Sequence, residues 1–292
     1  MGLGMTLSAM LGPVATAGGV IFVVASTNVY GDVIQQIGGS RVAVTSMLSD
    51  PNTDPHAYES STNDARAVAK ATLVVQNGLG YDAFMGKLEA ASPNSRRVVY
   101  DAGAALGYKP GDNPHIWYAP TTMPRVAMFI AAELARQDPA DRLLFAANLR
   151  TFRASLIPWT DLIATTRRRF GSVPVAITEP VFGYGATALG LKILTPPSFA
   201  LAMQQGIDPS PQDVQTEERL FTQNKVRCFF YNQQAVAPIT VTLIGLARSG
   251  RIPIVGVYET KPPAKTYQQW MLAEVQATAL ALSRGASTEK LQ

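Results

Sequence analysis

The chain of 292 residues contains one cysteine and only two histidines. A disulfide needs two thiols and a cysteine-rich zinc site needs several, so neither can form within this chain. Cys228 lies in the apolar run VRCFFY, which predicts a buried and inert thiol. Cysteine usage therefore leaves the cellular compartment open.

Charge is also scarce, because charged residues make up 16% of the chain and the formal net charge is +4. The triplet Arg167-Arg168-Arg169 has no aromatic or glycine-rich nucleic-acid motif beside it and is interpreted as a solvated helix face. We expect no nucleic-acid partner. With 47% hydrophobic residues, the chain can bury a real core and is long enough for roughly two domains.

Residues 1–27 carry no charge and contain Ala15-Thr16-Ala17, a small-x-small pattern of the signal-peptidase type. This pattern predicts export, with residues 1–19 as a signal remnant, although the basic start of such a signal is missing. The alternative is an apolar lead into the first strand. Gly18-Gly19 interrupts the stretch, and a membrane-spanning helix needs roughly twenty apolar residues. We expect an exported protein of the periplasm or cell surface, without a lipid anchor because no cysteine lies near residue 20.

Apolar runs alternate with amphipathic stretches along most of the chain. This rhythm predicts an α/β fold in which mainly parallel sheets are flanked by helices on both faces. Strands are predicted at 20–27, 42–48, 71–77, 96–101, 173–178, 192–195, 226–231 and 252–258. Helices are predicted at 29–38, 61–70, 80–91, 181–190, 211–224, 235–249 and 264–283.

The rhythm stops between Thr121 and Phe170, a nearly strandless region broken only at Asp138-Pro139, where one helix ends and another starts. The predicted architecture is two doubly wound α/β lobes joined by a long, rigid helix. The lobes would comprise residues 20–137 and 171–292, and the linking helix residues 138–170.

Each histidine follows a proline in a loop, His56 in DPHAYES and His115 in NPHIWYAP. A proline stiffens the backbone, so each loop can aim its imidazole. Imidazole is the commonest protein ligand for transition metals, and acidic partners are available in the second half of the chain. Glu179 directly follows one predicted strand, and Glu259 directly follows another.

Ligands of parallel α/β sheets bind beyond the carboxyl ends of the strands, which is where these residues are expected. Taken singly, a loop histidine is more often a surface residue, and a glutamate after a strand is more often solvated. The joint pattern of proline-braced residues in both lobes favours a metal site between the lobes.

The segments STNVYGDVIQQIGG, DPHAYE, VVQNGLGYD, NPHIWYAP, TEPVFGYGATALGL and IPIVGVYE resemble the metal-binding, extracytoplasmic solute-binding proteins of ABC transporters. The resemblance runs from about Val23 to Ser283. It implies two α/β lobes joined rigidly by a long helix, one zinc, manganese or iron ion between them, and a membrane permease as partner. It also implies that the chain is not an enzyme, and we expect a monomer.

The resemblance implies four metal ligands: His56, His115, Glu179 and Glu259. An ungapped match to some manganese carriers would replace Glu259 by Lys261. Two imidazoles with two carboxylates form a harder ligand set than three histidines, which favours Mn²⁺ or Fe²⁺ without excluding Zn²⁺. Since imidazole must be neutral to bind a metal, affinity is expected to fall below about pH 6.5.

Two rival functions remain at this stage. A metal-dependent hydrolase could use the same residues with an open coordination position, although no HExxH pair or Gly-x-Ser-x-Gly elbow is present. An adhesin could keep the fold without transport. Aromatic residues beside the proposed ligands, Tyr58, Trp117, Tyr118 and Tyr184, could screen the ion from water or simply pack in the cleft.

Overall fold

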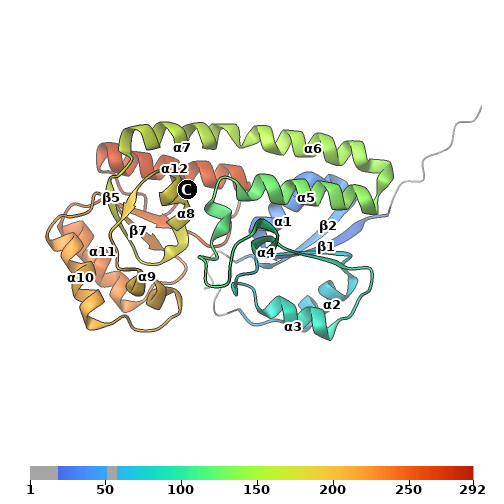
Figure 1. Cartoon of the computed structure of the whole chain (residues 1–292), viewed down its shortest axis with the longest axis horizontal. Helices are drawn as coiled ribbons and strands as arrows, with labels where there is room; N and C mark the ends of the chain where they lie inside the picture. Colours follow the sequence, from blue (N-terminus) through green and yellow to red (C-terminus); the bar gives the residue numbers. More distant parts are fainter. Residues whose placement is uncertain (1–18, 51–57, 292) are drawn as a thin grey trace, which may run out of the picture.

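The computed structural model describes residues 19–50 and 58–291, and its backbone forms two α/β lobes under a shared layer of helices (Figure 1). Every paired strand is parallel. The first sheet has the order β2-β1-β3-β4, and the second repeats this pattern as β6-β5-β7-β8. The strands are β1 Ile21–Thr27, β2 Val42–Leu48, β3 Leu73–Gln76, β4 Val98–Asp101, β5 Pro174–Ile177, β6 Lys192–Ile193, β7 Phe229–Asn232 and β8 Ile254–Val257.

The predicted parallel fold is thus confirmed, and all eight predicted strands are present with somewhat different ends. The helices of the first lobe are α1 Asn28–Gly38, α2 Thr62–Lys70, α3 Phe84–Ala91, α4 Ala102–Leu106 and α5 Thr122–Gln137. Those that follow are α6 Arg142–Ser155, α7 Ile157–Phe170, α8 Gly183–Ala188, α9 Pro197–Gln204, α10 Pro211–Thr222, α11 Pro238–Ser249 and α12 Tyr267–Arg284. The prediction omitted α4 and α9.

Local chemistry explains where several helices begin. Ser61 and Asp64 form the predicted capping box of α2, in which each side chain bonds to the other residue's backbone N–H. Thr266 and Gln269 make the same arrangement at α12. Prolines occupy the first positions of α9, α10 and α11, where a missing N–H costs nothing.

The linking segment is two helices instead of one. α6 and α7 follow one another across the top of Figure 1, with a break at Leu156. Pro158 lacks the N–H that would bond to the carbonyl of Ala154, so the regular ladder is interrupted there. Leu156 keeps helical dihedrals of −82° and −14°, which is why the two segments still run on from each other.

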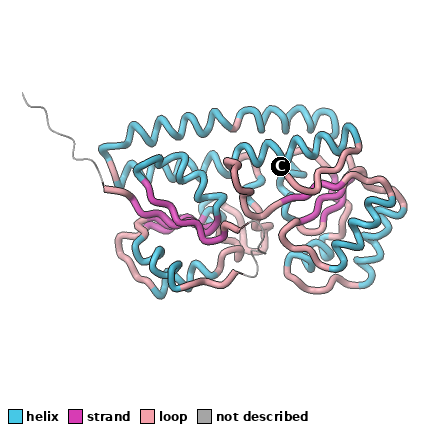
Figure 2. Tube along the Cα trace, turned by 180° about the vertical axis from the view of Figure 1, so that it is seen from behind, coloured by secondary structure: helices cyan, strands magenta, loops and turns pink. Residues whose placement is uncertain are grey.

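One large hydrophobic cluster spans both lobes, and each lobe also has a smaller cluster of its own. The largest buried cluster includes Val23 of β1, Phe182 after β5 and Trp270 of α12. α12 returns along α7 and also contacts α1 of the first lobe. Figure 2 shows the sheets on either side of a loop-rich middle, beneath the common helical layer. No helix among the described residues is both long and apolar enough to cross a membrane.

Candidate metal site

His115 lies in the first lobe, immediately before the 3-10 turn Ile116–Tyr118, and its side chain is fully buried. The Asn113 side-chain oxygen lies 3.0 Å from the His115 backbone N–H and 2.7 Å from its Nδ1. The Asn113 amide nitrogen donates to the carbonyl of Pro180 in the second lobe at 2.7 Å. Because the Asn113 amide nitrogen donates to the Pro180 carbonyl, the Asn113 group that faces His115 Nδ1 is its oxygen. An amide oxygen only accepts hydrogen bonds, so His115 Nδ1 carries the proton. Nε2 of the neutral ring is then available as a metal ligand.

The loop before His115 is fixed from within the first lobe. Asn77, after β3, donates to the carbonyl of Pro114 at 2.9 Å and accepts from the Tyr30 hydroxyl at 2.6 Å. The Asp82 carboxylate accepts hydrogen bonds from the backbone N–H groups of Asn77 and Gly78, which closes the turn after β3. Gly78 has φ +76°, and a Cβ there would collide with the Asp101 carboxylate, so this turn requires glycine.

Aromatic rings enclose the His115 imidazole. Trp117 and Tyr81 contact it edge-on, with ring centroids at 5.3 Å and 5.9 Å. Tyr184 donates to the carbonyl of Asn113 at 3.1 Å, as its predicted place beside the site suggests. Tyr58 instead donates to Asp64 at the start of α2 and packs against Phe84.

Glu259 lies two residues beyond the end of β8, and its side chain is fully buried against His115. Glu259 Oε2 lies 3.3 Å from His115 Nε2, while Glu259 Oε1 accepts from Asn232 Nδ2 at 2.6 Å. Two ligands that lie about 2.0–2.2 Å from one ion at a tetrahedral angle are about 3.3–3.6 Å apart from each other. The buried His115 and Glu259 side chains therefore already stand at the separation of two ligands of one ion.

Glu179 lies two residues beyond the end of β5 and is 3% exposed. Its Oε2 accepts from the same Asn232 Nδ2 at 3.1 Å. Asn232 ends β7, the strand beside β5, and Gln234 N–H donates to its side-chain oxygen at 3.0 Å. This bond orients the Asn232 amide so that one NH₂ group faces both glutamates. The sequence reasoning missed Asn232, whose only signal was its position at the end of a strand beside β5.

His56 lies outside the described residues. Among the residues that the structure describes, no three His, Cys, Asp or Glu side chains are grouped closely enough to hold a metal ion. The described part of the predicted site is thus the His115–Glu259 pair, with Glu179 linked to it through Asn232. Lys261 is the residue that an ungapped match would place at the fourth ligand position. Its ammonium donates to the carbonyl of Lys265 at 2.6 Å and lies 3.9 Å from Asp32.

Burial shapes the electrostatics around this pair. Burial, and secondarily the negative charge of Glu259, raises the pKa of the Tyr81 hydroxyl well above its usual range. The Tyr118 hydroxyl donates to the carbonyl of Tyr258 at 2.7 Å, and its oxygen lies 3.3 Å from the Glu274 carboxyl of α12. Burial raises the pKa of Glu274 to about 8, although its hydrogen bonds with Trp270 and Tyr118 act to lower the pKa. Neutral, hydrogen-bonded groups thus brace the backbone immediately before Glu259.

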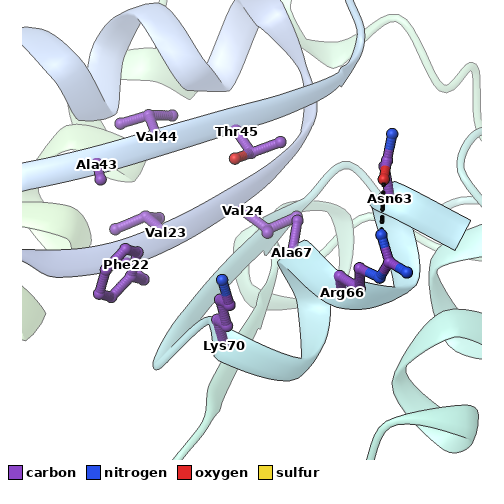
Figure 3. Close-up of a pocket in the computed structure, with 10 residues that line it drawn as sticks. All are labelled: Phe22, Val23, Val24, Ala43, Val44, Thr45, Asn63, Arg66, Ala67 and Lys70. Carbon is purple, nitrogen blue, oxygen red and sulfur yellow. Dashed lines mark hydrogen bonds between the residues drawn. The ribbon is translucent and has the colours of Figure 1, made fainter.

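Two cavities differ in their relation to the site. One of about 270 Å³ is lined by Glu179 together with the end of α9 and residues 235–237. The other, of about 310 Å³, lies between α2 and the β1–β2 strands (Figure 3). Its lining contains Arg66 and Lys70 but neither histidine nor carboxylate, so it offers no metal ligand of the expected kind. Of these two cavities, the one of about 270 Å³ is lined by a predicted ligand that the structure describes.

Known proteins with similar sequences are named as metal-transport or metal-binding proteins. The chain is 24% identical over 234 residues to the manganese ABC transporter substrate-binding lipoprotein PsaA of Streptococcus anginosus, covering 74% of this chain and 73% of that protein. It is 23% identical over 220 residues to the manganese-binding lipoprotein MntA of Bacillus subtilis (strain 168), covering 71% and 69%.

Solved structures support the fold. A mutant of the laminin-binding adhesin Lmb from Streptococcus agalactiae superposes with a TM-score of 0.75 at 22% identity, covering 90% of this chain and 100% of that one. A crystal structure of ZnuA gives a TM-score of 0.73 at 24% identity with the same coverage. The family model described as "Zinc-uptake complex component A periplasmic" (ZnuA) matches residues 23–281. The chain therefore belongs to the ZnuA family of metal-binding, substrate-binding proteins of ABC transporters.

Proposed function

We propose that this protein is the solute-binding component of an ABC transporter, which captures one divalent transition-metal ion between its lobes and delivers it to a membrane permease. The observation that carries the proposal is the buried pair of His115 Nε2 and Glu259 Oε2, 3.3 Å apart, one from each lobe. The expected ligand set is His56, His115, Glu179 and Glu259. The protein would act outside the cytoplasm, as a monomer, on Zn²⁺, Mn²⁺ or Fe²⁺.

Capture and hand-over, without bond chemistry, suit this ligand set. Four protein ligands would fill a tetrahedral shell and leave no position for an activated water, which a hydrolase would need. The buried aromatic rings around His115 favour exclusion of water for the same reason. The carboxylates and neutral imidazoles together suit Zn²⁺, Mn²⁺ and Fe²⁺, so the ligand types alone leave the choice of ion open.

Elemental analysis of protein purified without chelator tests the proposal. We expect near one transition-metal ion per chain in the natural protein, and competition among Mn²⁺, Zn²⁺ and Fe²⁺ would identify the preferred ion. The variants His56→Ala, His115→Ala and Glu179→Ala should each lose tight binding.

Glu217→Gln is the matched control, since Glu217 is a buried carboxyl of α10 that bonds to Thr195, not to any proposed ligand. This variant should keep the ion. If the natural protein held no ion at micromolar concentrations, or if Glu217→Gln lost the ion as fully as Glu179→Ala, the proposal would be wrong.

A further inference from the structure

The loop that carries Glu259 is attached to both lobes. On its own side, the Gln234 side-chain oxygen accepts the backbone N–H of Glu259 at 2.7 Å and that of Thr260 at 2.9 Å. Two residues beyond Glu259, the chain meets α1 of the first lobe. The Asn28 side chain accepts from Lys261 N–H at 2.8 Å and donates to Lys261 C=O at 2.8 Å, so it pairs with both backbone groups of one residue.

Further contacts of the same kind follow along α1. Asp32 accepts from the backbone N–H of Tyr267 at 2.8 Å, and its other oxygen lies 3.9 Å from the Lys261 ammonium. Gln36 exchanges hydrogen bonds with Gln268 at 2.9 Å and 3.1 Å.

Asn28, Asp32 and Gln36 are spaced four residues apart, so they share one face of the helix. This polar stripe of α1, defined by these three residues, contacts the segment from Lys261 to Gln268.

The members of the stripe differ in what they hold. Gln36 contacts Gln268 of α12, nine residues beyond Glu259, whereas Asn28 holds the backbone two residues beyond it. The Asn28 amide holds both the carbonyl and the N–H of Lys261, so the Lys261 backbone has little freedom to move. Glu259, between Gln234 and Lys261, is therefore anchored on both sides, and the second anchor belongs to the opposite lobe.

We infer that Asn28 is a positioning residue that slows release of the bound ion by holding the Glu259 loop against the first lobe. This inference rests on the proposed function, because it assigns a role to Asn28 in the same metal site. Asn28 has no hydrogen bond to the side chains of the described ligands His115, Glu179 and Glu259, and it acts through the Lys261 backbone. We call the two hydrogen bonds between the Asn28 side chain and the Lys261 backbone the latch. Loss of the latch would let Glu259 move away from His115, so the ion would leave sooner, while the rate of ion capture would change little.

The test compares Asn28→Ala with Gln36→Ala, which removes an interlobe contact from the same helix but far from Glu259. Zinc release into excess chelator would be followed by stopped flow, along with the association rate and the thermal midpoint. Residues that orient metal ligands typically change affinity 10–100-fold when replaced, so we expect Asn28→Ala to release zinc about tenfold faster with an association rate within about twofold of the natural protein. Gln36→Ala should release zinc at the natural rate.

Asn28→Asp keeps the acceptor for Lys261 N–H but loses the donor to its carbonyl, so an intermediate release rate is expected. Release from Asn28→Ala at the natural rate would overturn the inference. So would equal acceleration by Gln36→Ala, which would indicate general loosening of the lobes.

Amide exchange gives a readout that does not require an ion. If the latch holds the loop, Asn28→Ala should speed exchange at Glu259 and Thr260, whose N–H groups bond to Gln234 and not to Asn28. Unchanged exchange at these two amides would refute the latch even in a protein that bound no metal. Absence of binding by the natural protein would instead refute the proposed function, so the two failures can be told apart.

Discussion

Asn232 is the residue whose replacement tests most directly how the second lobe keeps two carboxylates together. It is 1% exposed, and its Nδ2 donates to Glu259 at 2.6 Å and to Glu179 at 3.1 Å. Asn232→Leu preserves the approximate volume and removes the donor. A hydrogen bond to a charged group contributes about 1.5 kcal/mol or more, so the loss of two should lower the free energy of unfolding by about 3 kcal/mol in the presence of chelator.

A bound divalent cation attracts the same carboxylates and replaces part of what Asn232 supplied. With saturating zinc, we therefore expect the loss in Asn232→Leu to shrink to about half, roughly 1.5 kcal/mol. The measurement is urea unfolding followed by circular dichroism, with and without zinc. Asn148→Ala, which removes one hydrogen bond from α6 to the Ile37 carbonyl, should lose the same amount in both conditions. An equal loss for Asn232→Leu with and without zinc would refute the reasoning.

Three further predictions concern groups around and beyond the site. Asn113→Ala removes the acceptor that fixes the His115 tautomer, so zinc affinity measured by competition titration should fall 10–100-fold; unchanged affinity would contradict the role of this contact. Burial raises the pKa of Glu274 to about 8 in the folded protein, so the folded state holds a proton that the unfolded chain releases above about pH 4.5. Stability from this group is present at low pH and is lost as pH rises through 8, by about 1.4 kcal/mol per unit of pKa difference. Glu274→Gln should flatten this fall in urea midpoints measured from pH 5 to 9, and an unchanged profile would contradict it. Burial raises the pKa of the Cys228 thiol, so it should react with Ellman's reagent only after denaturation; rapid reaction of the native protein would show that the thiol is accessible.

The fold was predictable because buried parallel strands form continuous apolar runs, and those runs are separated by clear helical patterns. The sequence did not reveal α4 and α9. α4 has five residues, too few for a helical period to show, and it depends on the Asp101 side chain, which accepts the Ala104 N–H at 2.9 Å. α9 begins directly after Pro196 and has only eight residues, so no long helical pattern marks it.

The nearness of the two carboxylates was predictable from position, and the amides that hold them were not. Glu179 and Glu259 lie just beyond the ends of β5 and β8, so the rule that ligands bind at carboxyl ends of parallel strands indicates both as candidate ligands. Asn28, Asn113 and Asn232 lie at a helix start, in a turn and at a strand end, where asparagine is common for purely local reasons. Their roles depend on which chain segment lies opposite, and that is a property of the assembled lobes.

The buried charge of the site implies that the folded protein is more stable with its ion than without it. His115 and Glu259 are 0% exposed and Glu179 is 3% exposed, and moving a carboxylate out of water costs several kcal/mol unless a countercharge is near. A divalent cation supplies two positive charges to this one place. An ion that binds only the folded state adds a free energy of RT ln(1 + [L]/Kd), about 4 kcal/mol at a thousand times Kd. The free energy of unfolding should therefore rise with the logarithm of free zinc, and the slope should vanish in His115→Ala, where the ligand opposite Glu259 is gone.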